Sequence, residues 1–229
     1  MTPELTTLVY TAAAVGFLHT LVGPDHYLPF VAIGKARSWS TSKTLGVTFA
    51  CGLGHVLGSV ALGMVGVATG AALTSLVGIE SVRGDLAAWA LTAFGLVYLV
   101  WGVRRAYKKH GHHHIFGKHG HQLTDHPHNG LPGDSKSSIT IWVLFIVFVL
   151  GPCEVLIPLL LYPAAQSSTH GMILVTTVFG VTTIATMMAT VGVLLAGIKL
   201  IPMKRMERYS HALAGLAILL CGVSIQLGL

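Results

Sequence analysis

The sequence has few charged residues and few cysteines. Only 10% of its 229 residues are Asp, Glu, Lys or Arg, and just 8 are acidic, whereas 53% are hydrophobic. This excludes an ordinary soluble domain, in which about a quarter of the residues are charged. Three cysteines, Cys51, Cys153 and Cys221, are too few for a disulfide framework. The Gly-x4-Gly-Lys-Ser/Thr phosphate-binding motif is missing, and we expect no ATP-dependent activity and no enzyme.

The sequence contains several long runs of apolar residues. A run of about 20 apolar residues is long enough to cross a bilayer as a helix, and an open sheet cannot span lipid. The fold class predicted is therefore an all-α polytopic membrane protein, one transmembrane domain over residues 1–229. Six spans are expected, at 5–34, 45–69, 86–103, 138–162, 171–198 and 210–228.

The basic residues predict an orientation. All but one of the 14 Lys and Arg residues follow the first, third or fifth span, and Arg83 is the exception. Because basic loops stay on the cytoplasmic side, both termini are expected outside a cell (inner) membrane. The charge of +6 then reflects topology, and no nucleic-acid partner is expected.

Two Gly-Pro pairs indicate an internal repeat. Gly23-Pro24 interrupts the first span and Gly151-Pro152 interrupts the fourth. Three spans per half make the halves inverted, with repeat one at 1–103, a connecting loop at 104–137 and repeat two at 138–229. Inverted repeats with broken helices point to a site near the middle of the membrane.

Polar side chains lie near these predicted breaks. Asp25 and Glu154 are the only acids expected well within spans, and intramembrane ionisable groups usually serve function. Imidazole and carboxylate ligands together suit transition metals. For His55, a hydrogen bond to a neighbouring helix is an alternative role, and Cys153 is either a soft ligand or a small packing residue. The candidate metal site comprises His19, Asp25, His26, His55, Cys153 and Glu154.

The loop after the third span is rich in histidine. Eight of the 13 histidines fall between residues 109 and 132, among Gly, Lys and Asp, without apolar periodicity. Such tracts bind transition metals, and binding weakens as imidazole is protonated below a pKa of about 6.5. A cytoplasmic metal buffer is predicted, with a merely polar linker as the alternative. Its histidines are His110, His112, His113, His114, His119, His121, His126 and His128.

Three segments resemble a known family. The His19-x5-Asp25-His26 segment followed by 28–34 resembles membrane nickel proteins of the hydrogenase and urease accessory type. Gly52-Leu53-Gly54-His55 and residues 150–155 are similar to two signatures of the nickel/cobalt transporter superfamily, whose efflux branch has a similar His-rich loop. The permeases of that superfamily have one residue fewer before Asp-His, and Asp-Thr in place of Pro152-Cys153.

The resemblance implies secondary transport of Ni²⁺ or Co²⁺ by alternating access, with the ion as substrate and no tightly bound cofactor. Besides the metal and the lipid bilayer, a second copy or a metalloenzyme-maturation protein is the expected partner. Two alternatives stay open. One is a non-transporting metal-delivery accessory protein. The other is a membrane thiol–disulfide electron carrier, which Gly151-Pro152-Cys153-x4-Pro158 resembles; such carriers need a matching cysteine where this chain has Asp25, unless Cys51 substitutes.

Overall fold

The chain folds into a bundle of helices. The computed structural model describes residues 2–70, 73–108, 134–151, 153, 155–165, 168–199 and 207–228, and no strand occurs among them. The first predicted span is α1 (Pro3–Val22) and α2 (Leu28–Ala36), separated by the short 3-10 turn η1 (Pro24–His26), and the fourth is α5 (Asp134–Leu150) and α6 (Leu156–Ala165). The other elements are α3 (Thr41–Thr69), α4 (Leu73–Lys108), α7 (Thr169–Lys199), η2 (Glu207–Tyr209) and α8 (Ser210–Gln226).

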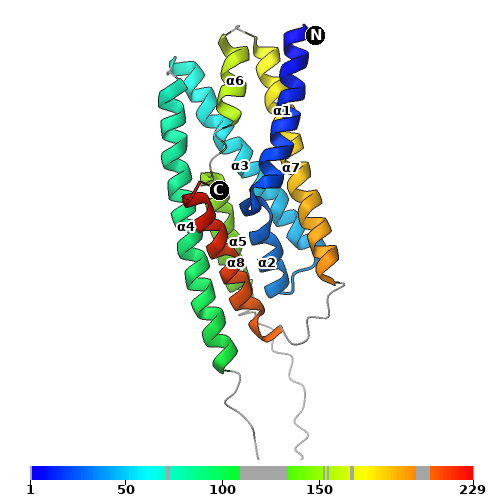
Figure 1. Ribbon diagram of the computed structural model, residues 1–229, viewed down its shortest axis with the longest axis vertical. Coiled ribbons are helices and arrows are strands. Elements are labelled where there is room, and N and C mark those ends of the chain that lie inside the picture. Colours follow the sequence, from blue (N-terminus) through cyan, green and yellow to red (C-terminus); the bar gives the residue numbers. More distant parts are fainter. Residues whose placement is uncertain are drawn as a thin grey trace, which may run out of the picture.

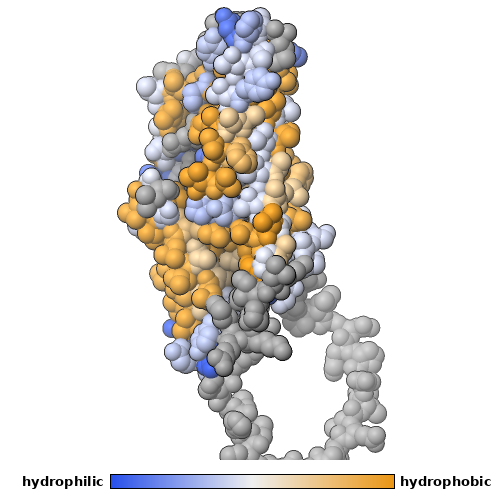
Figure 2. All heavy atoms as spheres, turned by 45° about the vertical axis from the view of Figure 1, so that its right-hand side comes forward, coloured by the Kyte–Doolittle hydropathy of each residue, from blue (hydrophilic) through white to orange (hydrophobic). Residues whose placement is uncertain are grey.

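The bundle is a membrane protein with several apolar helices. Within the described ranges, four helices are long and apolar enough to cross a bilayer, namely α1, α3, α4 and α7, and shorter apolar helices include α8. Large apolar side chains point outward, with Trp89 65%, Val97 69% and Val193 72% exposed. Figure 2 shows apolar residues spread along the flank and hydrophilic residues gathered at the upper end. Lipid is the solvent that accommodates such a flank.

The helix breaks lie near mid-length in the bundle. Figure 1 shows α2 continuing downward from α1, and α6 lying above α5 along the same long axis. Helix α1 packs on α7, α3 packs on α7 and α5, and α8 packs on α4. The interrupted spans therefore place irregular backbone inside the bundle, where only protein can satisfy its polar groups.

Four glycines bring α4 and α8 into close contact. Gly95 and Gly102 of α4 face the backbone of α8, and Gly215 and Gly222 of α8 face the backbone of α4. In each helix the two glycines are seven residues apart, about two turns, so they lie on one face. Small residues at these positions let helix backbones approach without a hydrophobic driving force.

Adding one methyl group at this contact should separate the two helices. A Cβ at Gly95 would meet backbone atoms of Leu219, whereas a Cβ at Gly78 of the same helix would meet open space. We expect Gly95→Ala to destabilise the folded protein by about 1–3 kcal/mol, the usual cost of overpacking. Thermal unfolding in detergent measures this, with Gly78→Ala as the matched control. Equal melting temperatures for the two variants would contradict the close contact.

The first break satisfies most of its backbone locally. The amide of Gly23 donates to the carbonyl of His19, and the amide of His26 donates to the carbonyl of Gly23 over 3.1 Å. The Tyr27 hydroxyl reaches back to the carbonyl of Leu21 at 3.3 Å. Pro24 has no backbone N–H that would need a hydrogen-bond acceptor, and its fixed φ suits the start of a turn.

The second break is held by side chains of neighbouring helices. Arg83 of α4 donates to the carbonyls of Val149, Leu150 and Gly151 over 2.9–3.3 Å. Its guanidinium also pairs with the fully buried Glu80 at 2.7 Å. Glu80 Oε1 accepts from the Cys153 amide at 2.8 Å and from the Ser59 hydroxyl at 2.7 Å. Carbonyls left unpaired at the end of α5 thus find donors on α4.

These contacts correct two predictions from sequence. Helix α4 begins at Leu73, well before the predicted third span of 86–103. Glu80 lies in that extension and is buried, so the prediction that Asp25 and Glu154 are the only acids within the membrane bundle was wrong. The acidic and basic residues of this stretch lower its apolar character, but Glu80 and Arg83 neutralise each other inside the protein. Arg83 is accordingly an internal partner of α5, which explains its exception to the charge pattern.

Removing the Arg83 cation should leave the buried Glu80 carboxylate without a counter-charge. We expect Arg83→Met to destabilise the protein by about 3–5 kcal/mol, the usual cost of breaking a buried ion pair. In the double variant Glu80→Gln/Arg83→Met the charge is gone, while the new amide side chain keeps an oxygen for Ser59 and Cys153. The double variant should therefore be more stable than the single variant. Denaturant unfolding in mixed micelles measures both, and a double variant that is no more stable would contradict the charge argument.

Candidate functional site

Three histidines from the first break and from α3 lie together. The rings of His19 and His26 have centroids 4.7 Å apart, and those of His26 and His55 are 5.3 Å apart. His19 belongs to the last turn of α1, His26 closes η1 and His55 lies midway along α3. One ring nitrogen from each histidine lies within 4.8 Å of the other two. The break after α1 is what turns His26 back toward His19.

Acceptors on the first break fix the ring of His26. Its Nδ1 lies 3.3 Å from the Asp25 carboxylate and 3.2 Å from the Gly23 carbonyl. Since both neighbours accept hydrogen bonds, Nδ1 carries the hydrogen. Gly23 has a steric role as well, because a Cβ there would lie 2.6 Å from His26 Nδ1. Glycine at this position lets the imidazole lie against the backbone.

The ring of His55 is fixed by the second break. Its Nδ1 lies 3.2 Å from the carbonyl of Phe148 at the end of α5, and the residue is buried. A Cβ at Gly151 would lie 3.1 Å from the same nitrogen. His55 therefore makes the helix-interface hydrogen bond expected as its alternative role, and it also joins the histidine cluster. It connects the two breaks.

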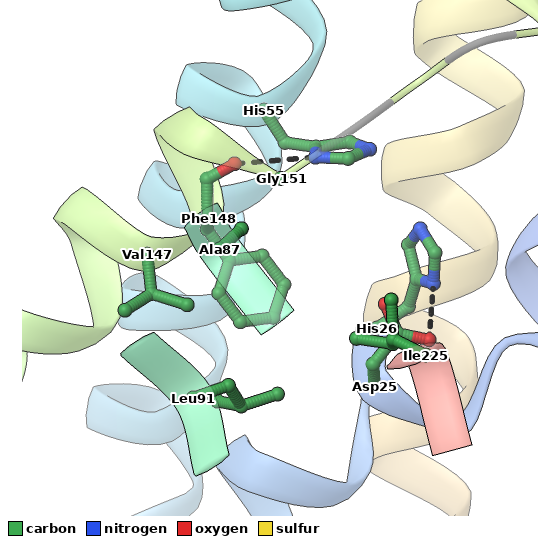
Figure 3. Close-up of a pocket in the computed structure, with 9 residues that line it drawn as sticks. All are labelled: Asp25, His26, His55, Ala87, Leu91, Val147, Phe148, Gly151 and Ile225. Atoms are coloured by element: carbon green, nitrogen blue, oxygen red, sulfur yellow. Dashed lines mark hydrogen bonds and ion pairs between the residues drawn. The ribbon is translucent and has the colours of Figure 1, made fainter. Parts of the chain in front are cut away.

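A small cavity lies between the breaks. Its volume is about 20 Å³, and its lining includes Asp25, His26, His55, Phe148 and Gly151. Figure 3 shows the Asp25 carboxylate holding the His26 ring and the Phe148 carbonyl holding the His55 ring, from opposite sides of this space. A cavity of this size holds one water molecule or a single ion.

The structure brings together part of the predicted site. His19, Asp25, His26 and His55 lie at one place, and Gly23, Pro24 and Gly151 form the breaks as predicted. Cys153 lies two residues beyond Gly151 and is fully buried, with its amide on Glu80. Pro152 and Glu154 lie outside the described residues. So do the loop histidines His110, His112, His113, His114, His119, His121, His126 and His128.

The cysteines do not form a pair in this arrangement. Cys51, Cys153 and Cys221 are all free thiols and all buried. Cys51 and Cys221 belong to the larger apolar core, which includes Phe30 and Ile218. Cys153 belongs to a separate apolar cluster. Cys153 is the one of the three that stands outside a helix.

Sequence reasoning missed the groups that position the second break. Ser59, Glu80 and Arg83 form one hydrogen-bonded group that binds backbone groups of Val149 and Cys153, yet none of them was a candidate. Arg83 carried a signal, because it was the only basic residue that departed from the topological pattern. A cation in such a place needs internal acceptors.

Comparison with known proteins overturns the family predicted from short motifs. A family model described as the cytochrome C biogenesis protein transmembrane region matches residues 28–224. No curated protein and no solved structure matches the chain. The predicted membership of the nickel/cobalt transporter superfamily was wrong, and the transport of Ni²⁺ or Co²⁺ predicted from it is withdrawn.

The short motifs misled for a physical reason. Glycine and proline are frequent in membrane helices, and ionisable residues within the membrane mark functional sites of many kinds, so a short motif of these residues does not identify one family. The segment from His19 to His26 precedes the matched region, and the other two motifs fall inside it. The match favours the alternative stated for the Gly151-Pro152-Cys153 segment. Because it covers more than half of the sequence, the chain belongs to the family of the cytochrome c biogenesis protein transmembrane region.

Proposed function

We propose that this chain is an intramembrane thiol–disulfide electron carrier whose reactive thiol is Cys153. The single observation that carries this proposal is the family match, which includes all of α5, α6 and the break between them. The resemblance of Gly151-Pro152-Cys153 to the cysteine motif of such carriers, inside the matched region, supports it as well.

The place of Cys153 on a chain break suits exchange chemistry. Disulfide exchange requires a thiolate to reach a disulfide sulfur, so its rate depends on access to the attacking sulfur. Cys51 lies inside α3 and Cys221 inside α8, where helical hydrogen bonds fix the backbone. Residues around Cys153 are held instead by Arg83 and Glu80, through side-chain contacts that can open without unwinding a helix.

The second sulfur of the exchange comes from outside this chain. Asp25 stands where a carrier of this type has its matching cysteine. Cys51 and Cys153 are both free thiols, and they belong to separate apolar clusters. We therefore assign the partner sulfur to a separate thiol compound or protein.

The exchange balances as a two-electron transfer. The Cys153 thiolate attacks one sulfur of a partner disulfide, the partner S–S bond breaks, and the second partner sulfur leaves and takes up a proton. A donor thiolate then attacks the Cys153 sulfur of the mixed disulfide, and the first partner sulfur leaves and takes up a proton. A second donor thiolate attacks this new mixed disulfide, forms the donor disulfide and releases the Cys153 thiolate, so two donor thiols are oxidised for each partner disulfide reduced. Because Cys153 is fully buried, the break has to open before any of these attacks.

Liposomes provide a direct test. With reduced glutathione outside and oxidised glutathione inside, the protein should oxidise two outer thiols for each inner disulfide reduced. We expect Cys153→Ser to lower this rate to that of empty liposomes, since no other thiol of the described residues sits at a break. Cys221→Ser, the matched control, should retain it. A Cys153→Ser variant that transfers electrons at the normal rate would overturn the proposal.

We also propose that the six spans, two of them interrupted, form two inverted halves, with repeats at 1–103 and 138–229 around the loop at 104–137. The Gly-Pro breaks after α1 and α5 stand at matching places in the two halves. The charge pattern supports external termini and a cytoplasmic loop, and the internal contacts of Arg83 remove its one exception.

Reporter fusions test this topology. Alkaline phosphatase fused after Leu229 should be active, because it folds only outside the cytoplasm. A green fluorescent protein inserted in the loop near residue 120 should fluoresce, because it matures inside. The reverse pattern, with a fluorescent C-terminal fusion of green fluorescent protein, would place the termini in the cytoplasm and contradict the proposal.

A further inference from the structure

Among the residues that the structure describes, three buried ring nitrogens in the histidine cluster have no hydrogen-bond partner. They are the Nε2 atoms of His19, His26 and His55. His26 and His55 are each only 3% exposed. A buried polar atom without a partner is unusual in a folded protein and calls for an unseen water or ion. The proposed thiol chemistry does not use any of these three side chains.

In two of the neutral rings the hydrogen is on Nδ1, which makes the unpartnered Nε2 a hydrogen-bond acceptor. Nδ1 of His26 faces the Asp25 carboxylate and the Gly23 carbonyl, and Nδ1 of His55 faces the Phe148 carbonyl. Both Nδ1 atoms therefore carry the hydrogen, and in the neutral ring Nε2 keeps its lone pair. Metal-binding histidines show this arrangement, in which an acceptor holds the far nitrogen and so fixes tautomer and ring orientation.

From this geometry we infer that His19, His26 and His55 bind a divalent transition-metal cation. One nitrogen from each ring already lies within 4.8 Å of the others. A tetrahedral ion with bonds of about 2.0–2.1 Å to nitrogen needs its ligand atoms about 3.4 Å apart. The nitrogens would therefore have to move together by at most about 1.4 Å. Imidazole ligands favour ions such as Zn²⁺ and Cu²⁺ over Ca²⁺ and Mg²⁺.

The surroundings also suit a cation. The Asp25 carboxylate beside His26 supplies one negative charge, and the cavity of about 20 Å³ next to His26 and His55 leaves room for a water as fourth ligand. Three histidines with an open fourth position are a ligand set that keeps the ion accessible. Two of the ligands sit on the first break, and His55 is anchored to the second, so the ion would tie the two breaks together.

Zinc binding to the full-length, metal-depleted protein tests this inference. The eight loop histidines should be changed to serine in every sample, because that tract binds metal by itself. We expect one Zn²⁺ per chain, and at least about a 100-fold loss of affinity in His55→Gln and in His26→Gln. His170→Gln, an exposed histidine outside the cluster, is the matched control and should bind normally. Asp25→Asn should weaken binding about tenfold, as loss of an orienting carboxylate does.

X-ray absorption at the zinc edge is a second test, and it needs no substitution in the cluster. It therefore remains informative if a variant fails to fold. The unmodified cluster should show about three nitrogen ligands near 2.0 Å and no sulfur near 2.3 Å. A sulfur ligand, an absence of bound zinc, or normal affinity in a folded His55→Gln variant would overturn the inference. Cys153→Ser should bind zinc normally, so a failure of the thiol proposal and a failure of this one are distinguishable.

Discussion

A helix interrupted inside a membrane exposes backbone groups that water cannot reach, and this chain meets that demand twice. At the first break the partners are local, from a 3-10 turn and the side chains of His26 and Tyr27. At the second break they come from other helices, since His55, Arg83 and Glu80 bind backbone groups of Phe148, Val149 and Cys153, respectively. The candidate groups of the site, three imidazoles and one thiol, all depend on these two irregular segments.

The two breaks carry different chemistry although they meet at one place. The first contributes two imidazoles and a carboxylate, and the second contributes the acceptor for His55 and the Cys153 thiol. The family match begins at residue 28, after the first break, and includes the second. The Cys153 thiol therefore lies inside the region that matches the family. Two of the three clustered histidines, His19 and His26, lie before that region.

The sequence predicted what depends on apolar run length and on Gly-Pro pairs. The helical class, the interrupted first and fourth spans, and the meeting of His19, His26 and His55 all followed from local patterns. It did not predict the buried Glu80–Arg83 pair, because charges that neutralise each other across one helical turn resemble a solvated loop when only hydropathy is considered. Nor did it give the right family, because short motifs at a helix break lack specificity.

The different capping of the two breaks has a consequence for membrane insertion. The first break contains its own partners, so it can form as soon as the first span enters the bilayer. The second needs His55 and Arg83, and both belong to helices that precede α5 in the chain. Since a protein is made from its N-terminus onward, α3 and α4 are already in place when α5 and α6 leave the ribosome. Because of this order, hydrogen-bond donors for the carbonyls at the end of α5 are present when the interrupted fourth span enters the bilayer.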